Sequence, residues 1–165
     1  MTDELVIRPG DGITFQLGGI AARTIVSASN TGGTLAIVEA PIGPKTLAGP
    51  LHTHRNEDSL WYVIDGEFAA QVGDRELHEG PGTVVFAPRG IPHTYWNPGT
   101  QPARYLEMAW PAGLERFLED MGILAANPTD DALMKVEELA KRFGVEMHWD
   151  SIAPLMEKHG VGFGG

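Results

Sequence analysis

Short runs of alternating apolar and polar residues fill the first two thirds of the chain. They predict β-strands, because successive side chains of a strand point to opposite faces. Gly, Pro, Asn and Asp separate the runs and favour turns. The expected strands are residues 5–7, 13–17, 23–27, 34–40, 52–54, 59–64, 68–72, 75–77, 84–87, 93–96 and 104–110. Many short strands without an intervening helix are typical of a sandwich or barrel.

After Trp110 the apolar spacing changes from that of a strand to that of a helix. One amphipathic helix is expected to present Leu114, Phe117, Leu118 and Met121. A second is expected to begin at Thr129 and to end at Gly144. Its apolar face would consist of Leu133, Val136, Leu139, Ala140 and Phe143. A third short helix is expected to begin near Asp150 or Ser151.

The change of period divides the chain into two parts. We assign residues 1–111 to a β-barrel domain and residues 112–165 to a helical C-terminal extension. The apolar helix faces predict that the extension packs on the barrel or on a partner subunit. The glycine-rich run at residues 160–165 is expected to fray.

The composition of the 165-residue chain argues against several classes of binding partner. A net charge of −10 argues against nucleic acid and anionic membranes, since both attract clustered Lys and Arg. The lack of cysteine excludes disulfides, thiolate ligands and a cysteine nucleophile. The first residues lack the features of a signal peptide, and the apolar runs are too short to cross a bilayer. We therefore expect a cytoplasmic protein.

Three histidines have a spacing that indicates a metal site. His52 and His54 are two residues apart in an expected strand, so their side chains emerge on the same face. His93 follows a turn rich in glycine and proline. Three imidazoles converging inside a barrel would hold one divalent transition metal. Fe(II) is favoured, and Mn, Ni, Co, Cu or Zn would also suit these ligands.

The residues around these histidines resemble the two motifs of the cupin superfamily. The second motif is matched at each fixed position by Gly82, Pro88, Gly90, His93 and Asn97, and the first by His52, His54 and Gly66. The resemblance covers about residues 33–110. It implies a mainly β fold, a double-stranded β-helix or jelly-roll cupin barrel, here with a short α-helical C-terminal tail. It also implies a homodimer whose interface includes the N-terminal strands.

The sequence departs from the usual first motif at Ser59, where cupins commonly have a glutamate ligand. Strand parity places position 59 on the same face as Trp61 and Val63. Two acidic neighbours are alternative fourth ligands. Asp58 has a suitable spacing, but its parity points outward. Glu57 lies in the preceding turn and would reach the site only if that turn is unusual.

Parity predicts that Trp61 and Val63 line the pocket, with Phe86 and Tyr95 as further candidates. The alternative is that these side chains simply fill a narrow barrel. We expect a metal-dependent oxidoreductase of dioxygenase type that acts on a small aromatic or dicarbonyl-like substrate. The resemblance supports this, because some cupin dioxygenases use three histidines without the glutamate. The rival is a non-enzymatic small-molecule binding or sensing protein. No general base is visible in the sequence.

Overall fold

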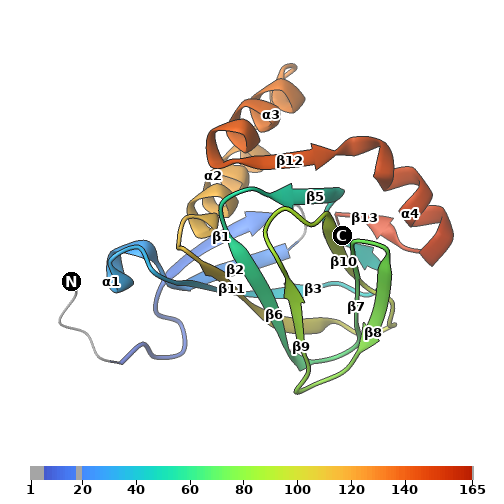
Figure 1. Cartoon of the computed structure of the whole chain (residues 1–165), viewed down its shortest axis with the longest axis horizontal. Coiled ribbons are helices and arrows are strands. Elements are labelled where there is room, and N and C mark those ends of the chain that lie inside the picture. The colour runs from blue at the N-terminus through green and yellow to red at the C-terminus, as the bar shows by residue number, and fades with distance from the viewer. Residues whose placement is uncertain (1–5, 18–19, 165) are drawn as a thin grey trace.

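The computed structural model describes residues 6–17 and 20–164, which form two facing β-sheets with helices at one end (Figure 1). In this part of the chain, one sheet has six strands and the other seven. The first has the order β1 (Ile13–Leu17), β2 (Ile20–Val26), β3 (Ala36–Ile42), β11 (Ala103–Trp110), β6 (Asp58–Asp65) and β9 (Val84–Ala87). The expected cupin jelly-roll is thereby confirmed.

The second sheet carries the histidine strands. Its order is β12 (Val145–His148), β5 (Leu51–His54), β10 (His93–Asn97), β4 (Thr46–Leu47) and β13 (Gly162–Phe163). Strand β7 (Phe68–Val72) also pairs with β10, and β8 (Arg75–Glu79) pairs with β7. The His52–His54 strand is therefore held between β12 and β10.

The alternation along β6 shows how the sequence builds the interior. Ser59, Trp61 and Val63 are fully buried, while Tyr62 between them is exposed. Trp61 and Val63 pack with Tyr105 of the adjacent strand β11 and with Phe68 of the other sheet. Complete burial of each large apolar side chain contributes roughly 1.5–3 kcal/mol, so the interior face also fixes the register of the strand.

The three expected helices are α2 (Leu114–Ala126), α3 (Ala132–Phe143) and α4 (Ile152–His159), with a 3₁₀ turn at Trp149–Ser151. A short helix that was not expected, α1 (Ala28–Thr31), interrupts the strands. Leu114 and Phe117 of α2 join Leu139 and Val145 in a second core. Leu133 was expected on the buried face of α3 but is 59% exposed, because it lies in the first turn, away from this core.

The C-terminal segment is more than a helical tail. Strand β12 pairs antiparallel with β5, and β13 pairs parallel with β4. The expectation that the final glycine-rich run frays is wrong for residues 161–164. Val161 is buried with Leu47 and Trp96, and the Gly164 amide donates a hydrogen bond to the Leu47 carbonyl at 3.1 Å. The expected strand at 5–7 lies partly outside the described residues, and Ile7 has no regular structure.

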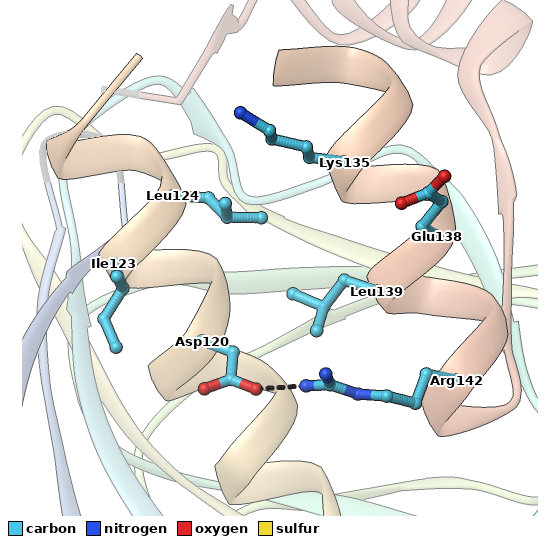
Figure 2. Close-up of a pocket in the computed structure, with 7 residues that line it drawn as sticks. All are labelled: Asp120, Ile123, Leu124, Lys135, Glu138, Leu139 and Arg142. Carbon is cyan, nitrogen blue, oxygen red and sulfur yellow. Dashed lines mark hydrogen bonds and ion pairs between the residues drawn. The ribbon is translucent and has the colours of Figure 1, made fainter. Parts of the chain in front are cut away.

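A shallow hollow of about 440 Å³ separates α2 from α3 (Figure 2). Asp120 and Arg142 form an ion pair across it at 2.5 Å, with Leu139 between the helices. Its rim is charged and it contains none of the candidate histidines, so it is not the predicted site. Within the described ranges, no helix has both the length and the hydropathy to span a membrane.

Candidate metal centre

Strands β5 and β10 bring the three histidines together. His52 and His93 are direct partners across the antiparallel β5–β10 pair, and His54 lies two residues further along β5. One ligand nitrogen from each of the three rings lies within 4.8 Å of the other two. The period of two along β5 and the cross-strand pairing thus produce a compact group of three imidazoles.

Backbone carbonyl groups orient two of the rings. The Nδ1 atom of His52 lies 2.9 Å from the Pro50 carbonyl oxygen, and that of His93 lies 2.8 Å from the Ile91 oxygen. A carbonyl oxygen only accepts hydrogen bonds, so each Nδ1 is the protonated nitrogen. Each Nε2 therefore keeps a free lone pair. A backbone partner of this kind is what usually fixes the tautomer of a metal-binding histidine.

The imidazoles are held in the neutral form that metal binding requires. Burial lowers the pKa of His52, and it lowers the pKa of His93 to about 3. Burial, followed by repulsion from the other two rings, lowers the pKa of His54 well below its usual value. Among the described residues, His93 Nε2 and His54 Nδ1 are buried without a hydrogen-bond partner. Neutral, unpartnered nitrogen donors fit a divalent transition metal.

Ser59 and its acidic neighbours lie in three different environments. The Ser59 hydroxyl is buried in the interior without a hydrogen-bond partner among the described residues. Asp58 faces outward and accepts hydrogen bonds from the backbone and side chain of Arg89, which lower its pKa. Glu57 is buried near Gly113, and burial raises its pKa. In the described structure, neither carboxylate belongs to the three-histidine group.

A largely apolar cavity of about 260 Å³ opens beside His52 and His54. Its wall comes from three parts of the chain: the barrel, helix α2 and the C-terminal segment. Its wall includes Tyr95, Glu107, Phe117, Met121, Met147, Trp149 and Phe163. The sequence prediction limited the pocket to the barrel, because pairing of β12 and β13 with the histidine sheet could not be foreseen.

The four predicted pocket residues divide into three groups. Tyr95 lines the cavity, and its hydroxyl lies 2.5 Å from that of Tyr105. Trp61 and Val63 are fully buried in the barrel core, where the Trp61 ring lies 5.5 Å from His93.

The prediction for Phe86 is wrong. Its side chain is 49% exposed and stacks on Trp110 outside the barrel, with ring centroids 5.9 Å apart. The alternation of β9 points Val85 and Ala87 inward instead.

Glu107 is a cavity residue that the sequence prediction missed. It lies on β11, is 6% exposed and lines the cavity with His52 and His54. Burial raises its pKa to about 7, and the neighbouring Trp61 side chain offsets this only in part. It shares the inward face of β11 with Tyr105 and Ala109, but this strand shows no clear polar–apolar alternation in the sequence.

The fold, the paired motifs and the three-histidine group define a cupin. Residues 39–109 match the family described as "Cupin domain", and they include both histidine strands. The chain therefore contains a cupin domain at these residues. No curated protein sequence matches the chain.

Several solved structures share this fold. An RmlC-like cupin from Shewanella frigidimarina is 18% identical, with a TM-score of 0.58, over 69% of this chain and 96% of the other. A predicted oxalate decarboxylase from Thermotoga maritima is also 18% identical, with a TM-score of 0.56, over 65% and 99%. KdgF from Halomonas sp. is 18% identical, with a TM-score of 0.53, over 59% and 84%. Identities this low establish the fold and leave the activity to the site.

Proposed function

We propose that the chain is a metal-dependent oxidoreductase of dioxygenase type that acts on a small aromatic or dicarbonyl-like substrate. The observation that carries the proposal is the group of three neutral imidazoles beside an apolar cavity. His52, His54 and His93 would hold one divalent transition metal, with Fe(II) favoured. When bound, the metal would supply open coordination positions and Lewis acidity for oxygen-containing ligands.

The protein's own contribution is orientation and exclusion of water. The Pro50 and Ile91 carbonyls hold the His52 and His93 rings in the ligand tautomer. Helix α2 and the segment containing Trp149 cover the cavity with apolar side chains. Electrostatic interactions are stronger in such an enclosed site than in water.

A binding or sensing protein without catalysis is the second candidate, and Ser59 is the observation that favours it. A serine hydroxyl adds no charge to the site, whereas a glutamate there would stabilise a divalent ion. The apolar cavity would serve a binding protein equally well. The two candidates differ in whether oxygen is consumed.

Oxygen uptake by Fe(II)-loaded protein separates the candidates. The panel should contain catechols, gentisate-like acids and β-diketones, with His93→Ala as the inactive variant and His78→Ala as the matched control on an exposed histidine. Uptake that requires His93 and not His78 supports the enzyme. Stoichiometric metal binding without uptake on any member of the panel would contradict it and favour the binding protein.

We also propose that the chain forms a homodimer. Strand β1 is an edge of the six-stranded sheet, and Ile13 on it is 54% exposed. An open edge of this kind offers unpaired backbone groups to a second copy. The support is the geometry of the edge together with the resemblance to dimeric cupins.

A further inference from the structure

Glu107 is a buried carboxyl group of the cavity wall that lies outside the three-histidine group. Its strand, β11, is paired on both sides, with β3 and with β6. The carboxyl group is therefore held rigidly at the cavity wall, only 6% exposed, alongside His52 and His54. It is not part of the three-histidine group. A buried carboxyl group costs free energy, so its presence beside a metal site points to a chemical role.

The other polar side chains of the cavity wall are poorer proton acceptors. His52 and His54 belong to the three-histidine group, whose ring nitrogens would hold the metal. The Tyr95 hydroxyl is engaged with Tyr105, and burial raises its pKa. Among the described residues that line the cavity, Glu107 is thus the group best able to accept a proton from a bound molecule.

The same wall restricts the charge of the ligand. Phe117, Met121 and Trp149 present apolar surface, and no lysine or arginine belongs to the described lining. A phosphate or a dicarboxylate would find no cation to pair with there, apart from the metal itself. The cavity therefore suits a molecule that enters uncharged, with an apolar body and oxygen atoms at one end.

Resting on the proposed metal site, we propose that Glu107 accepts the proton of an uncharged, enolisable or hydroxylic substrate as its oxygens bind at the histidines. The substrate C–H or O–H bond breaks, and its electron pair stays on the substrate as an enolate or phenolate. The proton forms a new O–H bond with the Glu107 carboxylate and returns to the product or to water on release.

The probe is acetylacetone, a weak acid that is mostly neutral at pH 7 and whose enolate absorbs at longer wavelength than its enol. Zn(II)-loaded protein is used, because zinc has no redox chemistry that would consume the probe. We expect the wild type to form the bound enolate at pH 7, and Glu107→Gln to form it at least tenfold more slowly in stopped-flow absorbance, with unchanged zinc content. Glu107→Asp keeps a carboxyl group and should form the enolate faster than Glu107→Gln.

Glu119→Gln is the matched control. Glu119 lies on α2, accepts a hydrogen bond from Thr24 at 2.6 Å and does not line the cavity, so this variant should behave as wild type. Circular dichroism and the thermal midpoint establish that each variant is folded. Equal rates of enolate formation in folded Glu107→Gln and wild type overturn the role of Glu107 and leave the metal site intact. Loss of zinc from Glu107→Gln overturns it too, since Glu107 would then be a ligand. A wild type that takes up no zinc contradicts the proposed function itself.

Discussion

Ser59 is a fully buried side chain whose hydroxyl has no hydrogen-bond partner among the described residues. Its partners across the two adjacent strands are Ala87 and Ala109, so the space around it is bounded by small side chains. A longer residue at this position would extend within the barrel, towards the interior that also contains His93. Position 59 is therefore where the missing carboxylate can be restored.

Ser59→Glu is expected to tighten Mn(II) binding at least tenfold, because a carboxylate is a harder ligand than imidazole and adds a negative charge. Ser59→Gln, which has nearly the same shape without the charge, should give no such gain. Isothermal titration calorimetry of the two metal-free variants measures the difference. Equal affinities for the two variants would mean that position 59 does not reach the metal.

Acid should destabilise the metal-free protein through its buried histidines. The pKa of His93 falls from 6.5 to about 3 on folding, so below pH 6.5 the unfolded chain binds a proton that the folded chain does not. Through His93 alone, the free energy of unfolding is lower by about 2 kcal/mol at pH 5 than at neutral pH. The raised pKa of Glu107 has the opposite effect and stabilises the folded protein as the pH falls. The contribution of His93 is therefore measured as the difference between the wild type and a variant that lacks this histidine.

We expect His93→Gln to lose about 2 kcal/mol less stability than the wild type between pH 7.5 and pH 5. Urea unfolding of chelator-treated protein at the two pH values measures this difference. His78→Gln, at an exposed histidine, should show the same change as the wild type. A His93→Gln variant that loses as much stability as the wild type would contradict the assignment.

At the scale of elements, strand β13 attaches the C-terminus to the barrel. Val161 precedes it and is 6% exposed, packed in a cluster with Leu47, Trp96 and Leu155. Val161→Ala should lower the free energy of unfolding by about 2 kcal/mol, for the lost methyl groups and the cavity they leave. Ile123→Ala, at a side chain that is 62% exposed, should change it by less than about 0.5 kcal/mol. Chemical denaturation measures the free energy of unfolding of both variants. Equal losses in Val161→Ala and Ile123→Ala would show that Val161 does not anchor this segment to the barrel.

How far an element could be predicted depended on its pattern. Strand β6 alternates clearly, so the inward direction of Ser59 and Trp61 was predicted correctly from period two. Strand β11 is apolar on its outward face as well, with Leu106 and Met108, so its inward carboxyl residue Glu107 gave no distinct signal. Strand β13 has two residues and depends on pairing with β4, a long-range contact that no local pattern encodes.

For the whole molecule, the homodimer proposal predicts a particular mass. Analytical ultracentrifugation at micromolar concentration should give twice the 17.8 kDa of one chain. Ile13→Lys introduces a charge at the exposed edge strand β1 and should shift the equilibrium towards the monomer. Lys is preferred over Pro here because it keeps the backbone donor of the strand. A wild type that sediments as a monomer would contradict the proposal.

The central claim is that one metal ion binds at three histidines contributed by two paired strands. The most direct measurement is the metal content of the protein after anaerobic reconstitution with Fe(II) and removal of free ion, in parallel with Mn(II), Ni(II) and Zn(II). We predict one ion per wild-type chain and per His78→Ala chain, and none for His54→Ala or His93→Ala. A wild type that retains none of the four metals, or a His93→Ala variant that retains one equivalent, would contradict the account.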